Sequence, residues 1–420
     1  MSAARALAAP PKPLGIRALN VAGRALDTIG LPIARLDEAT LLRAASRRTG
    51  LDDFGEPAFR DPLRRLLDAF EREARLTPLG RVIARGDILR LLENRLRMTA
   101  VARAHPEIAA QPVRAPLFIL GLPRTGTSIL HELLAQDPAN RVPMTWEVMH
   151  PWPPPEAATF ATDPRIAAVE RHFAGIDRVL PDFKRMHPMG ARLPQECVAL
   201  TAHDFATMIF HTTHRVPSYQ AWLEAADLRW VYASHRRQLQ YLQWKAPADR
   251  WVLKSPGHLW ALAALLAEYP DARIVQTHRD PLTVIASLTS LVTVLRSLAS
   301  DAVDPLEIAR DWTERLARGL DLATRVRAEH ALPPSQVLDV HFRDFMADPV
   351  GTIGRLYAHF GLVFSADAEA RMRRFLAAHP SDKHGAHTYT LAATGLDPDV
   401  ERRRYAGYQG HFGIASEAMS

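Results

Sequence analysis

The fold is decided by the stretch Phe118-Ile-Leu-Gly-Leu-Pro-Arg-Thr-Gly-Thr-Ser128. Its first residues form an apolar run ending at Gly121, which predicts a buried strand, and Ile129–Leu134 predicts the start of a helix. The tight loop between them directs backbone N–H groups and a helix N-terminus toward one point, an arrangement that suits a phosphate. Its glycine spacing matches a nucleotide-binding P-loop, but Thr127 stands where a P-loop kinase carries lysine, and the cation comes earlier, at Arg124.

Length and composition indicate a globular protein with one large or two modest domains. The chain has 420 residues, a net charge of +6 and one cysteine, Cys197, so no internal disulfide can form and we expect a cytoplasmic location. There is no long basic run, so we expect an anionic small molecule rather than nucleic acid as partner. We find no run of eighteen apolar residues and expect no membrane span. The first 26 residues contain no acid and are interrupted by prolines, which predicts a disordered start or a peripheral arm.

Short apolar strands alternate with helices after residue 112, which predicts an α/β fold with a central parallel sheet covered on both faces. Ligands then bind at the carboxyl ends of the strands. The expected strands are Leu117–Gly121, Trp251–Lys254, Ala272–Thr277 and Gln336–Val340, and the helices that follow the last three are His258–Tyr269, Pro281–Leu298 and Pro349–Phe360.

Two further regions complete the expected organisation. Residues 1–111 are predicted to form a helical cap or arm, or an element for homo-oligomer formation, and residues 112–420 the main domain. An insertion of about 143–245 separates the first two strands. Its prolines between Trp146 and Pro155 exclude regular structure there, and Pro194 to His211 is predicted to be a helix.

A second motif follows the third strand. Arg279 stands at the expected sheet edge, Pro281 suits the first position of a helix, and Ser287 comes eight residues after Arg279. Arg279 and Ser287 together can bind a second phosphate near the first loop. Taken alone, they are better explained by a local ion pair and a serine that bonds its own helix.

The two motifs in order resemble those of the sulfotransferases that use 3′-phosphoadenosine 5′-phosphosulfate, most closely the bacterial broad-specificity branch. The family's first motif reads Pro-Lys-Ser-Gly-Thr-Thr, and here Pro123–Ser128 reads Pro-Arg-Thr-Gly-Thr-Ser. The resemblance implies a P-loop-like three-layer fold and sulfuryl transfer to a hydroxyl group without a required metal. It also implies that the donor is bound by the residues Arg124, Thr125, Gly126, Thr127, Ser128, Arg279 and Ser287.

The resemblance also implies catalytic roles. Arg124 and Lys254 would stabilise the leaving phosphate, although arginine does not act as the point charge that lysine provides. The family's histidine base has no exact counterpart, because Pro256 occupies its position and His258 follows two residues later. His258 and Glu196 are therefore alternative bases, and Glu147 is a weaker third candidate.

The acceptor is expected to be a small lipophilic hydroxylated molecule, because the insertion is rich in aromatic residues and methionine. Its basic residues Lys184, Arg185 and Arg192 leave an anionic or carbohydrate acceptor open. His387 or Tyr389 near the acceptor is a further conjecture.

His203, His211 and His214 have a spacing compatible with a metal, but no supporting ligand pattern accompanies them, so we expect no metal site. Two other functions stay open: a P-loop kinase, which Thr127 disfavours, and a non-catalytic nucleotide-binding scaffold.

Overall fold

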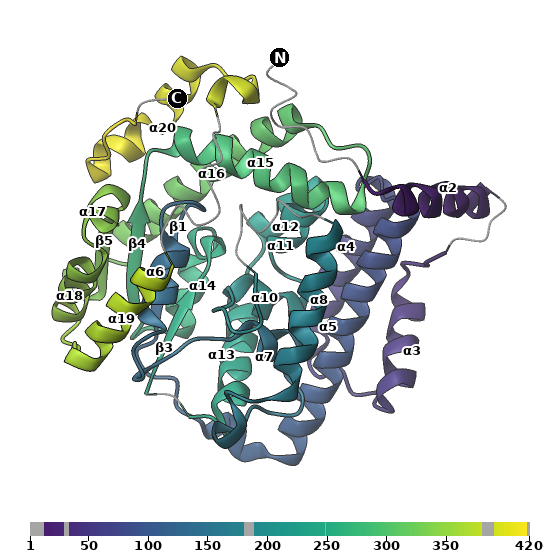
Figure 1. Cartoon of the computed structure of the whole chain (residues 1–420), viewed down its shortest axis with the longest axis horizontal. Coiled ribbons are helices and arrows are strands. Elements are labelled where there is room, and N and C mark those ends of the chain that lie inside the picture. The colour runs from purple at the N-terminus through teal and green to yellow at the C-terminus, as the bar shows by residue number, and fades with distance from the viewer. Residues whose placement is uncertain (1–11, 29–32, 180–188, 248, 380–389, 418–420) are drawn as a thin grey trace.

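The computed structural model describes residues 12–28, 33–179, 189–247, 249–379 and 390–417. Its centre is a sheet of five parallel strands in the order β2-β3-β1-β4-β5 (Figure 1). The strands are β1 (Leu117–Gly121), β2 (Asn140–Arg141), β3 (Arg250–Lys254), β4 (Arg273–His278) and β5 (Val337–His341). Every residue of the central strand β1 is buried, as its apolar sequence predicts.

Helices cover both faces of this sheet, so the predicted three-layer α/β fold is confirmed. On one face, Ile119 and Val275 pack with side chains of α6, α17, α18 and α19, and on the other, Phe118 and Ile274 pack with those of α13, α14, α15 and α16. The helices after β1 and β3 to β5 are α6 (Thr127–Leu134), η5 (Pro256–Leu259), α14 (Leu262–Glu268), α15 (Pro281–Ala299), α16 (Pro305–Glu329), η6 (Pro334–Gln336), α17 (Phe342–Ala347), α18 (Pro349–His359), α19 (Ala366–Ala378), η7 (Leu391–Thr394) and α20 (Pro398–Phe412).

The N-terminal region is helical, as expected, and includes a helix where a disordered start or a peripheral arm was expected. Its elements are α2 (Leu14–Thr28), α3 (Glu38–Thr49), η1 (Pro57–Phe59), α4 (Arg60–Arg72), α5 (Pro78–Ala104) and η2 (Pro106–Ala110). Gly80 of α5 lies against the end of α15, where an added Cβ would stand 2.0 Å from the Ala299 carbonyl oxygen. Because α3 to α5 contribute to the same core as the sheet, the boundary near residue 111 stays a prediction.

The insertion differs from the sequence expectation in two places. A helical turn, α7, includes Trp146 to Met149, because the first proline of the run comes only at Pro151. The helix expected from Pro194 to His211 is three short pieces, because Phe205 is left-handed with φ of 55°. The insertion comprises α7 (Thr145–Met149), η3 (Ala157–Thr159), α8 (Pro164–Val179), α10 (Cys197–Thr201), η4 (Ala202–Asp204), α11 (Ile209–Thr213), α12 (Pro217–Ala225) and α13 (Arg229–Gln243).

The helix after β3 is also divided. Ser255 caps the short η5, its side chain accepting a hydrogen bond from the Gly257 N–H, and α14 starts only at Leu262. By contrast, α15 forms as predicted: Asp280 caps it by accepting from the Leu282 N–H, and Pro281 takes the first position. Within the described residues, α15 is the one helix long and apolar enough to cross a membrane, but most of it is buried in the core, as is common for core helices of soluble proteins.

Candidate functional site

The loop between β1 and α6 has the shape expected of a phosphate site. Arg124 and Gly126 are both left-handed, with φ of 66° and 85°, and α6 begins directly after them at Thr127. Thr125 fixes the loop from within, because its hydroxyl donates to the Leu122 carbonyl at 2.6 Å and lies 2.6 Å from the hydroxyl of Thr277 on β4. The backbone N–H groups at the start of α6 are thus held ready for an anion.

Arg279 joins the second motif to this loop. Its guanidinium donates to the Arg124 carbonyl oxygen at 3.0 Å and lies over the ring of Phe342, 4.1 Å from the centroid. The two sequence motifs, more than 150 residues apart, therefore meet at the carboxyl ends of β1 and β4. Ser287 is buried in the second turn of α15, and no hydrogen bond joins it to Arg279 or to the loop within the described residues.

A C-terminal segment lies against Arg279, which the sequence did not reveal. The Glu417 carboxylate pairs with Arg279 at 3.0 Å, through both the Nε and Nη2 groups. Its backbone N–H donates to Asp280 at 2.7 Å, and Asp280 also accepts from Arg402 of α20 through both carboxylate oxygens. Hydrogen bonds and ion pairs of Arg402 and Glu417 thus hold the C-terminal segment against the second motif.

Helix α20 makes a further contact at the end of β4. The hydroxyl of Tyr408 lies 2.8 Å from Nδ1 of His278, and the ring of Phe412 stacks on the same imidazole at 4.2 Å. Asp339 of β5 lies 2.8 Å from Nε2. Burial lowers the pKa of His278, so the imidazole is neutral near pH 7 and its Nδ1 can accept a hydrogen bond from the Tyr408 hydroxyl.

Lys254, Glu196 and Ser128 form a second polar cluster at the carboxyl end of β3. The ammonium group of Lys254 forms an ion pair with the Glu196 carboxylate and donates to the Ser128 hydroxyl at 3.2 Å. Lys254 is almost fully buried, whereas Glu196 retains about a fifth of its side-chain exposure. Because Ser128 lies in the first turn of α6, the cluster adjoins the phosphate loop and brings three of the predicted residues together.

His258 lies in the first turn of the short η5, which begins at Pro256 as expected, but its side chain is buried in the core instead of facing the strand ends. Its ring packs edge-on against Phe118 at 5.1 Å, and Nδ1 lies 2.6 Å from the Tyr232 hydroxyl. Burial lowers the pKa of His258 well below its ordinary value, so the imidazole is neutral. Its Nε2 atom is buried and forms no hydrogen bond with any described residue, Lys254 and the phosphate loop included.

Glu147 belongs to the protein's framework, so its candidacy as a base is wrong. It is fully buried, and each of its carboxylate oxygens accepts a hydrogen bond from Arg141 at 2.7 Å. One oxygen also accepts from the Met144 N–H. The Glu147 carboxylate therefore caps the start of α7 and is too buried to reach an acceptor.

An apolar pocket lies beside the Lys254 cluster. Two of its lining residues follow the cluster directly in the chain: Ser255 comes after Lys254, and Cys197 comes after Glu196. Three of its lining residues carry a buried polar atom that has no hydrogen-bond partner among the described residues: Nε2 of His258, Oε1 of Gln220 and Nε1 of Trp260. Unsatisfied polar groups are costly in an interior, and these three are groups that a partly polar ligand in the pocket would satisfy.

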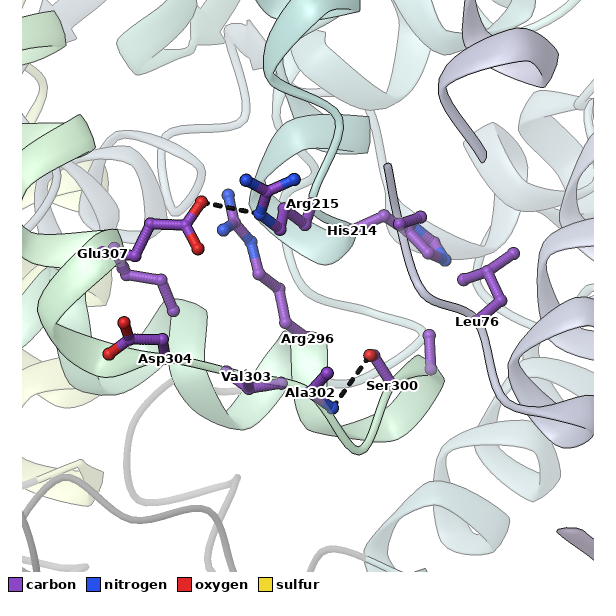
Figure 2. Close-up of a pocket in the computed structure, with 12 residues that line it drawn as sticks. Leu76, His214, Arg215, Arg296, Ser300, Ala302, Val303, Asp304 and Glu307 are labelled. Atoms are coloured by element: carbon purple, nitrogen blue, oxygen red, sulfur yellow. Dashed lines mark hydrogen bonds and ion pairs between the residues drawn. The ribbon is translucent and has the colours of Figure 1, made fainter. Parts of the chain in front are cut away.

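A second pocket lies at the other end of α15 (Figure 2). There Arg215 pairs with Glu307 at 2.6 Å, and Arg296 donates to the His211 carbonyl at 2.7 Å. A helix of the length of α15 spans about 28 Å, which separates this pocket from Arg279. It therefore plays no part in the donor site.

The three histidines considered for a metal have separate partners. His203 Nε2 lies 3.2 Å from the Asn94 amide, His211 Nε2 lies 2.7 Å from Asp311, and His214 Nδ1 lies 2.9 Å from Thr213. No grouping of three metal-ligating side chains occurs in the part of the chain that the structure describes. Lys184, Arg185, His387 and Tyr389 lie outside that part, whereas Arg192 lies within it.

Comparison with known proteins agrees with this geometry. The model of the sulfotransferase family matches residues 116–366. The chain shares 34% sequence identity with sulfotransferase STF1 from Mycobacterium tuberculosis. Its crystal structure superposes with a TM-score of 0.79, over 88% of this chain and 98% of that one. The chain is 31% identical to STF9 from Mycobacterium avium, over 91% and 98% of the two chains, with a TM-score of 0.84.

A curated relative, the omega-hydroxy-beta-dihydromenaquinone-9 sulfotransferase Stf3 of Mycobacterium bovis, is 27% identical over 66% of this chain and 70% of its own length. The family match covers more than half of the chain, and it coincides with the segment that carries both phosphate motifs. The chain therefore belongs to the sulfotransferase family and is an enzyme that transfers a sulfuryl group from 3′-phosphoadenosine 5′-phosphosulfate to a hydroxyl group of a small acceptor.

Proposed function

We propose that the loop from Arg124 to Ser128 binds the 5′-phosphosulfate of the donor and that Arg279 and Ser287 bind its 3′-phosphate. The observation that carries this assignment is the hydrogen bond from the Arg279 guanidinium to the Arg124 carbonyl, which supports one continuous site for both phosphates. Gly126, Thr125 and Thr127 supply loop geometry and N–H donors, and Ser128 adds a hydroxyl contact.

For the transfer itself, the proposal assigns the base to Glu196 and charge stabilisation to Lys254 and Arg124. The acceptor oxygen attacks sulfur while its proton passes to the Glu196 carboxylate. The bond between sulfur and the bridging oxygen breaks, and adenosine 3′,5′-bisphosphate leaves with the electron pair. Lys254 is well placed to stabilise the negative charge that develops on that oxygen, because it already contacts the first turn of α6.

Glu196 is favoured over His258 because of what each side chain contacts. Glu196 touches the lysine of the proposed reaction centre, whereas His258 touches Phe118 and Tyr232. A neutral imidazole in an apolar pocket is suited to a hydrogen bond with the acceptor. We therefore assign His258 to acceptor binding in the pocket that it shares with Gln220 and Trp260.

The proposed acceptor is lipophilic and carries a second polar group besides the reacting hydroxyl. The apolar lining by Val198, Met208, Leu223 and Val231 supports the first property, and the three unsatisfied polar atoms support the second. The name of the curated relative Stf3 refers to a hydroxylated menaquinone derivative, which is consistent with this class.

The remaining parts of the proposal follow from charge and composition. Arg124 and Lys254 supply the positive charge that a departing phosphate requires, so we propose that the transfer needs no metal. A cytoplasmic location, the absence of a nucleic-acid partner and a homo-oligomeric state are retained as predictions.

The test uses ³⁵S-labelled donor with long-chain primary alcohols and polyprenols as acceptors. Glu196→Gln should lower kcat by about 10²–10⁴-fold, the range for loss of a general base. Binding of adenosine 3′,5′-bisphosphate should stay close to the wild-type value. His258→Gln should mainly raise KM for the acceptor, and Glu369→Gln, on exposed α19, is the matched control.

Two results would contradict the proposal. Full kcat in Glu196→Gln would remove Glu196 as the base, and a loss confined to kcat in His258→Gln would restore His258 to that role.

A further inference from the structure

Helix α2 is attached to the protein along one narrow side. The Asn20 side chain accepts a hydrogen bond from the Leu79 N–H at 3.1 Å, and Gly23 lies so close to Pro78 that an added Cβ would stand 2.4 Å from its Cβ atom. Lys12, just before the helix, pairs with Asp301 at 2.8 Å. In Figure 1, α2 projects at the edge of the molecule, on the opposite side from α18 and α19.

The outer side of α2 is apolar and exposed. Leu14 is 78% exposed, Val21 65%, Leu19 47% and Leu26 41%. At the 100° per residue of a helix, these four positions and the exposed Ala18 and Ala22 cover one continuous arc of about 160°, opposite the side that carries Asn20 and Gly23. A surface helix normally turns its apolar side toward the core, whereas the apolar side of α2 faces solvent.

The border of the arc is basic. Arg17 and Arg24 lie side by side at one edge of it, and residues 12–26 contain no acidic side chain, although Arg24 also pairs with the exposed Asp301 at 3.5 Å. Two further apolar side chains outside the helix are exposed, Ile33 at 41% and Val82 of α5 at 43%. An apolar arc with a cationic border is the arrangement by which helices lie in the interface of a negatively charged bilayer.

We propose that α2 places this enzyme on an anionic lipid surface, with Leu14, Leu19, Val21 and Leu26 inserted at the headgroup boundary. The charge complementarity between Arg17 and Arg24 and anionic headgroups selects this occupant over a second copy of the chain, whose α2 would carry the same positive charge. The inference stands apart from the assignment of the catalytic groups. A lipophilic acceptor, as in the proposed function, would give the enzyme a reason to work at such a surface.

The experiment is co-flotation of the full chain with vesicles of phosphatidylglycerol and phosphatidylcholine, compared with vesicles of phosphatidylcholine alone. We expect binding to the anionic vesicles that weakens as salt is raised. The double variant Leu14→Ser/Val21→Ser should bind about tenfold more weakly, and Arg17→Glu should lose much of the preference for anionic lipid. Val363→Ser removes another highly exposed apolar side chain, away from α2, and should change nothing.

Thermal unfolding of the variants should match the wild type, because the substituted side chains are exposed. Failure of the wild type to float with anionic vesicles would overturn the proposal, as would equal binding by the double variant. Light scattering that shows a dimer which the double variant dissociates, without vesicle binding, would assign the surface to a second copy instead. Sulfuryl transfer to a water-soluble alcohol should be unaffected by the double variant, which separates this test from that of the reaction.

Discussion

Replacement of Glu417 by glutamine is expected to strengthen binding of the donor nucleotide. The Glu417 carboxylate occupies the Nε and Nη2 donors of Arg279, the groups assigned to the 3′-phosphate. A nucleotide must displace this carboxylate before it can use the same donors. Glutamine keeps the backbone contact between residue 417 and Asp280 but removes the competing charge.

The size of the effect follows from the exposure of the pair. A hydrogen bond to a charged group contributes about 1.5–3 kcal/mol when well buried, and an exposed ion pair about 0–1 kcal/mol. The side chains of Arg279 and Glu417 are 23% and 17% exposed, which places the pair between these limits. We expect a gain of about 1 kcal/mol, or roughly a fivefold lower Kd.

Isothermal titration calorimetry with adenosine 3′,5′-bisphosphate measures this gain, and adenosine 5′-phosphate is the matched control ligand. Only the nucleotide that carries a 3′-phosphate competes with Glu417, so the control should bind the variant and the wild type equally. Unchanged or weaker binding of the bisphosphate, or the same gain for both nucleotides, would refute the competition.

Three other substitutions probe separate parts of the structure. Arg279→Ala should weaken binding of the bisphosphate by about 1.5–3 kcal/mol, and unchanged affinity in calorimetry would remove this residue from the donor site. Glu147→Ala leaves the buried Arg141 without its partner and should lower the free energy of unfolding by about 3–5 kcal/mol in urea titrations, while the folded variant still binds the bisphosphate. Burial lowers the pKa of His214 to about 4, so the unfolded chain takes up a proton that the folded one rejects. This contribution to stability is complete above pH 6.5 and is lost as the pH falls toward 4, by about 1.4 kcal/mol per pH unit, and His214→Asn should flatten the decline in urea titrations at pH 5 and 7.5.

The sheet and the phosphate loop could be predicted because their signals are local. Four strands were placed within one residue of their observed ends, since each is an apolar run bounded by a turn or a proline. The start of α15 could be predicted because Pro281 needs no N–H partner at the first position of a helix, and the structure adds Asp280 as its cap. By contrast, β2 has only two residues and carries no such pattern.

The failures occurred where tertiary packing overrides local preference. The segment from Pro194 to His211 has the composition of one helix, but Phe205 packs against Phe59 and Phe210 and adopts a left-handed conformation that breaks it. Likewise, the contact of Glu417 with Arg279 joins residues far apart in the chain. Hydrophobic periodicity carries no information about such polar pairs, so the competition at the donor site could be found only from the structure.

The choice between Glu196 and His258 shows the same limit at the level of chemistry. Each residue was expected in the first turn of a helix, where both a carboxylate and a neutral imidazole are well tolerated, so the sequence left both as alternatives, with His258 placed first. The difference arises at the end of β3. Lys254 is the last residue of that strand, and its ammonium group contacts Ser128 of α6 and Glu196. The chain then turns at Ser255, so that the His258 ring packs against Phe118. A base has to reach the oxygen that attacks sulfur, and sulfur has to lie near the lysine that stabilises the departing charge. The residue in contact with Lys254 meets both requirements, which is why the comparison of Glu196→Gln with His258→Gln tests the mechanism more directly than any change in the phosphate loop.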